Sequence, residues 1–463
     1  MIETTSLPTI AAIATPIGRG GIGIIRISGA LAYDIACKLT NKKQFAARKS
    51  VFCRFYNNQQ KVIDEGIILY FPAPNSFTGE DVIELQGHGG MILQNMLLAR
   101  VFELGANQAT AGEFSYRAFE NDKLDLVQAE AIADAIDATS EAAATSAMRS
   151  LTGDFSAKIN VLLEQLIHLR LHVEASIDFP DEEDIDFLSD GVIESKLNNI
   201  GDELIKVLAT AKQGQLLRDG INVVLAGKPN AGKSSLLNIL AGQERAIVTE
   251  VAGTTRDTLE ETIVLNGLTM HLTDTAGLRD TEDRVEQIGI KRAKDAISKA
   301  DILLMVFDLT QDVNPIELAK ELFGKIPKAE KLLMIGNKLD LIENSVSVSY
   351  ETNKNFGTDT YYEQINVSCE TSAGISELIA ALCKKVDFHP AENSLIARTR
   401  HIDALKRTQS HLNDAYEQLV VFKAGELVAE SLRQAQQSLG DITGKFSADD
   451  LLGKIFGSFC IGK

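Results

Sequence analysis

The stretch "INVVLAGKPNAGKS", Ile221–Ser234, decides the fold of the central part of the chain. Its first half is rich in Val, Ile and Leu, which is typical of a buried strand. "GKPNAGKS" then matches G-x-x-x-x-G-K-[ST], a loop whose backbone N–H groups cradle phosphates at the start of a helix. Lys233 is predicted to reach the β- and γ-phosphates and Ser234 a Mg²⁺ ion. A chance glycine-rich turn is the alternative, and the motifs that follow in order argue against it.

Two of these motifs supply phosphate and metal contacts. "GTTRD" (253–257) offers Thr255 as a second Mg²⁺ ligand. "DTAG" (274–277) ends a predicted strand, which places Asp274 near the metal and the Gly277 N–H near the γ-phosphate.

Two more motifs select the base. In "NKLD" (337–340), Asp340 can accept two parallel hydrogen bonds from N1–H and the exocyclic amine of guanine, which adenine lacks. "SCETSAG" (368–374) is predicted to contact the guanine oxygen through the backbone of Ser368 and Cys369, with Ser372 as an alternative further past the strand. The chain is therefore predicted to be a GTPase. The residues predicted to bind GTP and Mg²⁺ are Asn230, Ala231, Gly232, Lys233, Ser234, Ser235, Thr255, Asp274, Thr275, Ala276, Gly277, Asn337, Lys338, Asp340, Ser368 and Cys369.

One position departs from the familiar switch. Leu278 follows the glycine of "DTAG", where other GTPases carry a glutamine that orients the attacking water. Either the chain hydrolyses nothing, or other groups position the water and neutralise the developing charge. Glu286 in "RVEQIG" is a candidate for the group that positions the water. The alternative is that Glu286 is a solvated glutamate at the start of a helix.

Length and composition bound the remaining possibilities. A chain of 463 residues is too long for one core, and a net charge of -18 excludes a general nucleic-acid binder driven by phosphate neutralisation. Any RNA contact must be local or shared with a partner. No apolar run suits a membrane helix, no signal peptide is evident, and five scattered cysteines form no CxxC pair, so a cytoplasmic location without membrane contact is predicted.

The predicted architecture is multidomain. Residues 1–121 mix short β-rich runs with one helix, as in an α+β domain, and 122–217 are Ala- and Leu-rich and helix-periodic. Residues 218–386 alternate strands and helices, the pattern of an α/β P-loop domain, and 387–463 return to helix. The α/β domain is therefore predicted to be inserted between two halves of one all-α domain.

Two weaker motifs lack the neighbouring sequence features that their usual functions require. "GRGGIG" (18–23) fits a dinucleotide-binding loop but is followed by a strand instead of a helix. His88 in "GHGG" suggests an oxyanion loop, but the chain has no G-x-S-x-G nucleophile elbow, so a turn histidine is the better reading.

Together the motifs resemble the MnmE family of tRNA modification GTPases, and the resemblance spans the chain. The residues that carry it are "GKPNAGKSS", "AIVTEVAGTTRD", "DTAGLR", "NKLD", "ATPIGRGGIGIIRISG", "ELQGHGG", "NDKLDLVQAEAI" and "FCIGK". Departures are small: Lys228 stands where the family often has Arg, and Cys369 where Ala is usual.

For hydrolysis, the resemblance implies a K⁺ ion in the place of an arginine finger and Glu286 as the group that positions water. The implied K⁺ ligands are the Asn230 side chain and oxygens of Thr249, Val251 and Thr254. From the residues alone, Asn230 equally suits a role that only braces the loop.

For the carbon chemistry, the resemblance implies that the N-terminal domain dimerises and binds 5-formyl- or methylene-tetrahydrofolate. The implied folate residues are Arg26, Glu84, Lys123 and Lys463, each of which has an ordinary surface role when taken singly. With an FAD- and NADH-dependent partner resembling MnmG, a homodimer would install aminomethyl or carboxymethylaminomethyl groups at carbon 5 of wobble uridine in certain tRNAs.

The candidate catalytic residues are Lys233, Glu286 and Cys460. Carbon 5 of uridine becomes a good nucleophile after addition at carbon 6, and a thiolate is a suitable adduct-former; simple packing is the alternative for Cys460. Two other functions stay open. A ribosome-assembly GTPase usually appends a basic module, which the charge-balanced C-terminal helices do not resemble, and a GTP-regulated one-carbon transferase shares the folate site.

Overall fold

The computed structural model describes residues 7–16, 18–178, 191–243, 260–274, 295–342, 348–353, 360–389, 394–445 and 449–462. The chain divides into two compact units, one of residues 1–133, 150–201 and 407–463 and the other of residues 134–149 and 202–406. Within the described ranges, no helix combines the length and the hydropathy that a membrane span requires.

The first unit begins with a six-stranded sheet in the order β3-β4-β5-β2-β1-β6, antiparallel except for the β1–β6 pair. Its strands are β1 (Ile10–Ile13), β2 (Gly20–Ser28), β3 (Val51–Tyr56), β4 (Val62–Phe71), β5 (Val82–Gly89) and β6 (Asn107–Gln108). Helices α1 (Ala32–Thr40) and α2 (Met91–Glu103) pack on one face, where Ile25, Ile27 and Leu85 are buried. Because strand side chains alternate between faces, Arg26 and Glu84 lie on the other face.

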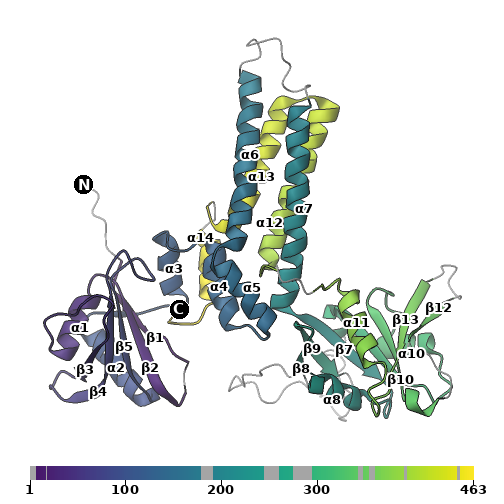
Figure 1. The fold of residues 1–463 in the computed structure, drawn as a ribbon, viewed down its shortest axis with the longest axis horizontal. Helices are drawn as coiled ribbons and strands as arrows, with labels where there is room; N and C mark the ends of the chain where they lie inside the picture. Colours follow the sequence, from purple (N-terminus) through teal and green to yellow (C-terminus); the bar gives the residue numbers. More distant parts are fainter. Residues whose placement is uncertain are drawn as a thin grey trace. The chain divides into compact units, whose positions relative to one another are not determined.

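The helices outside the two sheets range from short to long, with α6 and α7 the longest of those described (Figure 1). They are α3 (Glu113–Glu120), α4 (Leu126–Ile136), α5 (Glu141–Leu151), α6 (Asp154–Asp178), α7 (Val192–Asp219), α12 (Thr399–Glu417), the π-helix η4 (Gln418–Phe422), α13 (Gly425–Thr443) and α14 (Asp449–Gly457). In the first unit, α6 and α13 pack along each other although the whole α/β segment separates them in the sequence. The predicted insertion of one domain into another therefore matches the order of elements.

The second unit contains a seven-stranded sheet in the order β12-β13-β11-β10-β7-β9-β8. Its elements are β7 (Ile221–Gly227), α8 (Lys233–Gln243), β8 (Glu260–Leu265), β9 (Leu268–Asp274), β10 (Ile302–Asp308), α10 (Pro315–Phe323), β11 (Leu332–Asn337), the 3₁₀ helix η2 (Leu339–Leu341), β12 (Val348–Asn353), β13 (Thr360–Asn366) and α11 (Ile375–Lys385). The five central strands are parallel, and β8 and β12 add antiparallel edges.

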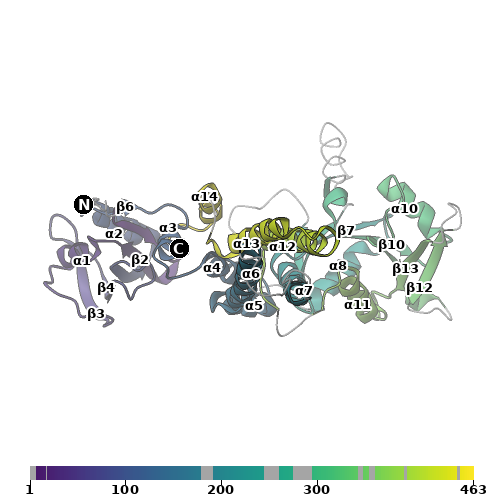
Figure 2. The same ribbon diagram turned by 90° about the horizontal axis from the view of Figure 1, so that it is seen from above.

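Helices cover both faces of this sheet. Helices α8 and α11 pack on one face and α10 on the other, and each face has its own buried apolar cluster (Figure 2). The nearly continuous apolar runs of β7, β10 and β11 follow from this burial, because a parallel sheet is covered on both sides. The predicted fold class, an α+β domain and a helical domain with an α/β P-loop domain, is confirmed.

Strand β7 lies between β9 and β10 in the sheet. The chain continues from β7 to β8 and β9 on one side of it and then crosses to β10 on the other side, so the strand order reverses at β7. Doubly wound sheets bind ligands at the carboxyl ends of strands where the order reverses. The loop that follows β7 carries the G-x-x-x-x-G-K-S motif at that point.

Candidate functional site

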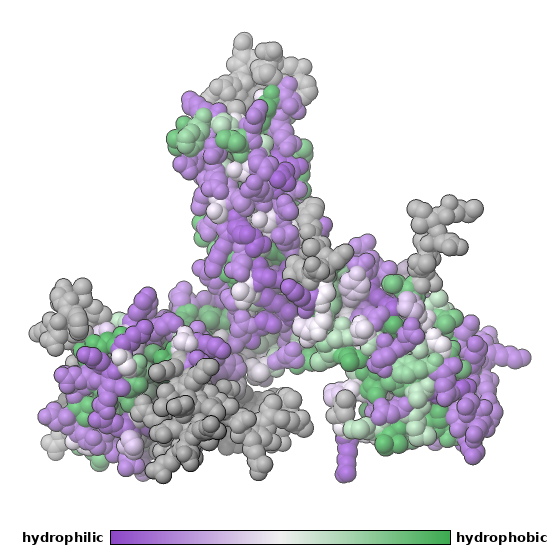
Figure 3. Space-filling view, turned by 180° about the vertical axis from the view of Figure 1, so that it is seen from behind, coloured by the Kyte–Doolittle hydropathy of each residue, from purple (hydrophilic) through white to green (hydrophobic). Residues whose placement is uncertain are grey.

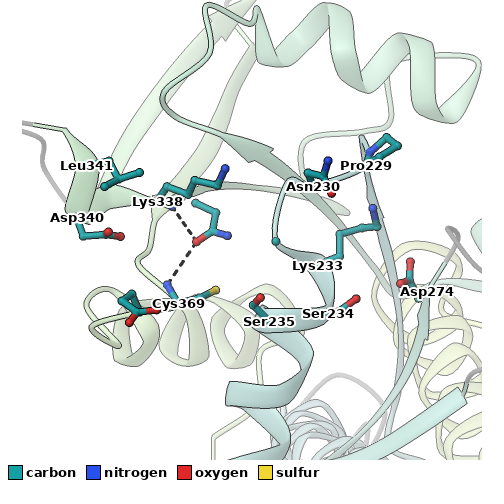
Figure 4. A pocket seen from close by; sticks show the side chains of 13 residues that line it. Pro229, Asn230, Lys233, Ser234, Ser235, Asp274, Lys338, Asp340, Leu341 and Cys369 are labelled. Atoms are coloured by element: carbon teal, nitrogen blue, oxygen red, sulfur yellow. Dashed lines mark hydrogen bonds between the residues drawn. The ribbon is translucent and has the colours of Figure 1, made fainter.

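A cavity of about 750 Å³ lies at the carboxyl ends of β7, β9 and β11 (Figure 4). The predicted residues that line it are Asn230, Gly232, Lys233, Ser234, Ser235, Asp274, Asn337, Lys338, Asp340 and Cys369. Other predicted positions lie outside the described residues: Thr249, Val251, Thr254, Thr255, Thr275, Ala276, Gly277, Leu278, Glu286 and Lys463. The cavity thus brings together motifs that are more than 100 residues apart in the chain.

The loop after β7 holds its lysine in place. Lys233 is the first residue of α8, and its ammonium group donates to the carbonyls of Gly227 (2.9 Å) and Lys228 (3.1 Å). Its side chain is largely buried, so the charge is fixed at the helix N-terminus, where an anion also meets unpaired N–H groups. The loop could not close with a larger residue at Gly232, whose φ is +93° and whose added Cβ would lie 1.9 Å from Nδ2 of Asn337.

Asn337 connects the phosphate end of the cavity to its other end. Its Nδ2 donates to the carbonyl of Ala231 at 3.0 Å, and its Oδ1 accepts from the backbone N–H of Lys338 (2.8 Å) and of Cys369 (3.4 Å). The side chain is buried. A single amide therefore sets the spacing between the loop of "GKPNAGKS" and the loops that begin at "NKLD" and "SCETSAG".

The Asp340 carboxylate is held by Ser368, for which the sequence predicted a backbone contact to the guanine oxygen. The Ser368 hydroxyl donates to Oδ1 of Asp340 at 2.5 Å and accepts from the N–H of Thr371 at 3.1 Å. Ser368 is fully buried and its own N–H donates to the carbonyl of Ala373, so that group is not free to reach a base. The Ser368 hydroxyl thus orients Asp340, and within this motif Cys369 and Glu370 line the cavity. The predicted backbone contact to the guanine oxygen stays a prediction, and Cys369 is the residue of the predicted pair that lines the cavity.

The Cys369 thiol has no evident chemistry of its own. Burial raises the pKa of this thiol above its usual value, which keeps it neutral. A contact through its backbone is therefore the role that suits this position.

The oxygen atoms near Lys233 suit Mg²⁺. The Ser234 hydroxyl and the Asp274 carboxylate both line the cavity, and Mg²⁺ prefers one or two protein oxygens together with phosphate oxygens and water. Within the described part of the chain, no group of three or more His, Cys, Asp or Glu could enclose a metal by itself. Asn230 is exposed at the tip of the loop with φ of 64°, and its side-chain amide oxygen is of a type that can serve as a K⁺ ligand.

A second set of predicted residues lies in the first unit, on the open face of the six-stranded sheet. Arg26 and Glu84 are cross-strand partners, and both Nε and Nη2 of Arg26 donate to Oε1 of Glu84 at 3.2 and 3.0 Å. The guanidinium lies 5.4 Å from the ring centroid of Phe77 and 5.8 Å from that of Phe114. Arg26 donates to Oε1 only, which leaves Oε2 of Glu84 as a possible acceptor for a ligand.

Lys123 belongs to the same neighbourhood. Its Cε lies 3.1 Å from the Cβ that a side chain at Gly79 would carry, and Gly79 follows Phe77 by two residues. Lys123 also lines a separate cavity of about 460 Å³ with Gln128 and Lys445. The structure thus places Arg26 and Lys123 against one loop, a relationship that their sequence positions do not indicate.

Cys460 is exposed, so core packing does not account for it. Its carbonyl accepts from the N–H of Gly112 at 3.4 Å, and Ile461 forms an antiparallel bridge with Ala111. Gly112 precedes α3, whose Phe114 lies beside Arg26. The C-terminal segment is therefore held against the part of the first unit that carries Arg26.

Comparisons with known proteins agree along the whole chain. Residues 9–123 match the family model described as GTP-binding protein TrmE N-terminus, and residues 126–460 match the model of the MnmE helical domain. The chain is 72% identical to the tRNA modification GTPase MnmE of Psychrobacter arcticus, with 99% of this chain and 97% of that protein covered. It is 61% identical to the protein of the same name from Acinetobacter baumannii, with 99% of each covered.

Among solved structures, the G domain of the T. maritima FeoB iron transporter is 26% identical. The match covers 36% of this chain and 98% of that one, with a TM-score of 0.26. A TM-score at that level supports no conclusion about this chain.

Proposed function

The chain belongs to the MnmE family of tRNA modification GTPases, and we propose that it works with a flavin-dependent partner on the wobble uridine of certain tRNAs. It binds and hydrolyses GTP and acts in tRNA modification. The proposed products carry aminomethyl or carboxymethylaminomethyl groups at carbon 5, with tetrahydrofolate as the one-carbon donor. The observation that carries the proposal is the placement of Arg26, Glu84 and Cys460 in one unit of a chain whose other unit carries the GTP site.

For hydrolysis, we assign phosphate binding to Lys233 and metal binding to Ser234, Thr255 and Asp274. The P-loop lysine is already held by backbone carbonyls, so it meets the phosphates without further rearrangement. Glu286 takes the place of the glutamine that Leu278 replaces, and a K⁺ ion bound through Asn230 supplies positive charge at the phosphates. GTP hydrolysis would drive association and rearrangement of the GTP-binding domains of the dimer, and it would take no part in the carbon chemistry.

For the folate donor, the open sheet face supports the proposal. Glu84 offers an acceptor for the donor edge of the pterin, and Lys123 and Lys463 offer cations for the glutamyl tail. The strands of this sheet also carry exposed apolar side chains, including Ile22 (66% exposed) and Phe52 (65%), and hydrophobic residues are visible on this part of the chain in Figure 3. Exposed apolar patches mark interaction sites, which supports a homodimer formed through this domain.

The partner and the location complete the proposal. An FAD- and NADH-dependent protein resembling MnmG would supply the redox chemistry. A net charge of -18 favours RNA contacts that are shared with that partner. We place the complex in the cytoplasm.

The test of the proposed function is the modification itself. A strain that lacks this protein is expected to lose aminomethyl and carboxymethylaminomethyl uridine from bulk tRNA, measured by mass spectrometry of nucleosides, and to regain both with a plasmid copy. A ribosome-assembly GTPase would leave these nucleosides unchanged and alter subunit profiles instead. A GTP-regulated one-carbon enzyme would alter folate pools while the nucleosides persist.

The guanine assignment has a test of its own. Asp340→Asn is expected to weaken GTP binding by about 100-fold, because the site then loses two charge-assisted hydrogen bonds to the base. The same variant should prefer xanthosine triphosphate, whose base presents an oxygen where guanine presents an amine. Titration with the two nucleotides measures the preference, and Glu370→Gln, a neighbour that also lines the cavity, is the control. Guanine selectivity that survives in Asp340→Asn would contradict the assignment.

A further inference from the structure

The end of β10 carries an acidic residue that no motif of the sequence singles out. Asp308 is the last residue of β10 and pairs in register with Asn337, the last residue of β11. Its Oδ2 accepts from Nζ of Lys338 at 2.6 Å, which makes an ion pair between two adjacent strand ends. Lys338 lines the nucleotide cavity, whereas Asp308 lies behind it and is only 6% exposed.

The two oxygens of Asp308 have separate partners. Oδ1 accepts from the backbone N–H of Thr310 at 2.9 Å and from its hydroxyl at 2.7 Å, while Oδ2 accepts from Nζ of Lys338 at 2.6 Å and, at 3.4 Å, from Nε2 of Gln311. Burial alone would raise the pKa of Asp308, but the hydrogen bonds from Lys338 and Thr310 outweigh it and hold the pKa below its usual value. The carboxylate is therefore ionised and oriented by its own loop, independently of any ligand.

Lys338 needs such an anchor. Its backbone has φ of 68°, a left-handed conformation that costs a non-glycine residue about 1 kcal/mol or more. The N–H is held by Oδ1 of Asn337, but a lysine side chain retains four rotatable bonds unless its ammonium group is tied down. In Figure 4 the Lys338 side chain lies between Asp340 and Asn230, along the part of the cavity that joins the base end to the phosphate end.

We propose that Asp308 is a positioning residue of the nucleotide site: it holds the Lys338 side chain as a preformed wall against the guanine base and its ribose. Asp308 itself touches no part of the nucleotide. A lysine that is fixed before binding loses less conformational entropy when the nucleotide enters, so the anchor raises affinity without a new contact. The inference rests on GTP binding alone and needs no part of the proposed carbon chemistry.

The test is a double-mutant cycle on the full-length protein. Asp308→Asn retains the acceptor for Thr310 and removes the charge that holds Lys338. It is expected to raise the Kd of both GDP and GTP by about 10-fold while kcat at saturating GTP changes less than about twofold, because the wall is the same for both nucleotides. Fluorescent GDP and GTP analogues at fixed Mg²⁺ and K⁺ measure the Kd values.

Lys338→Ala separates positioning from a structural role. In that background Asp308→Asn should cause no further loss of affinity, since the side chain that it positions is gone. Equal losses with and without Lys338 would overturn the proposal, as would an unchanged Kd in Asp308→Asn. Asp301→Asn, which removes another aspartate beside the start of β10 whose carboxylate accepts from Asn222, is the control for charge and should bind normally.

Folding is monitored by thermal melting without nucleotide. If Asp308→Asn melts early, Thr310→Ala takes its place in the cycle, because it loosens the Asp308 carboxylate but keeps the ion pair's charges. A loss of about threefold that disappears in the Lys338→Ala background supports the proposal, and a loss that persists there, or an unchanged Kd, overturns it. A wild-type protein that failed to bind GTP in the same titration would contradict the GTPase function instead.

Discussion

Cys460→Ser is expected to abolish the tRNA modification while GTP hydrolysis continues near the wild-type rate. A serine hydroxyl is a far weaker nucleophile than a thiolate at neutral pH, so addition to carbon 6 of uridine would fall below detection. The structure supports a chemical role because the Cys460 side chain is exposed in a segment that Gly112 and Ala111 hold by backbone contacts. Those contacts do not involve the thiol and remain in the serine variant.

The measurement is paired. The GTPase rate is determined in vitro, and tRNA nucleosides are analysed from cells that carry the variant as their only copy. Cys37→Ser, a half-buried cysteine on α1 of the same unit, is the matched control and should keep both activities. Normal modification in Cys460→Ser would end the catalytic assignment, and loss of both activities would indicate misfolding. A trapped covalent adduct between tRNA and Cys460 would distinguish a nucleophile from a residue that supports the folate site.

Exchange of K⁺ for Na⁺ at constant ionic strength is expected to lower the rate of GTP hydrolysis by about 10-fold or more. Leu278 cannot orient water, and we propose that a K⁺ ion, in place of an arginine finger, neutralises the developing charge on the phosphates. Na⁺ prefers shorter ligand distances than K⁺ and would fit the same oxygens poorly. Initial rates of phosphate release in the two salts measure the effect.

Asn230→Gly tests the implied ligand. Glycine accepts the positive φ of this position, so the loop keeps its conformation while the amide oxygen is removed. The rates in K⁺ and Na⁺ should then converge at the lower value. Equal rates in the two salts for the wild-type chain would remove the cation from the mechanism, and a variant that retains full K⁺ activation would restrict Asn230 to bracing the loop.

The sequence predicted the fold class well because its signals are local. A nearly continuous apolar run is typical of a strand in a sheet that is covered on both faces. The chain has three such runs, "INVVLAG", "ADILLMVFDL" and "KLLMIGN", and they form β7, β10 and β11 in the structure. The glycine at position 232 is also a local signal, because its φ of +93° is a conformation that favours glycine. The antiparallel edge strands β8 and β12 have no comparable signal, because an edge strand lacks the continuous apolar run of a strand buried on both faces.

By itself, the sequence therefore determined the kinds of elements, their order and the chemistry of the motifs that bind phosphate and base. Only the tertiary structure decided which side chains hold those motifs. Ser368 orients Asp340 across 28 residues of chain, and Asp308 anchors Lys338 across 30. Both contacts join the ends of different strands in a parallel sheet, and their existence depends on strand order and register. Those are set by how the whole sheet packs its two faces, a property that no local stretch of sequence contains.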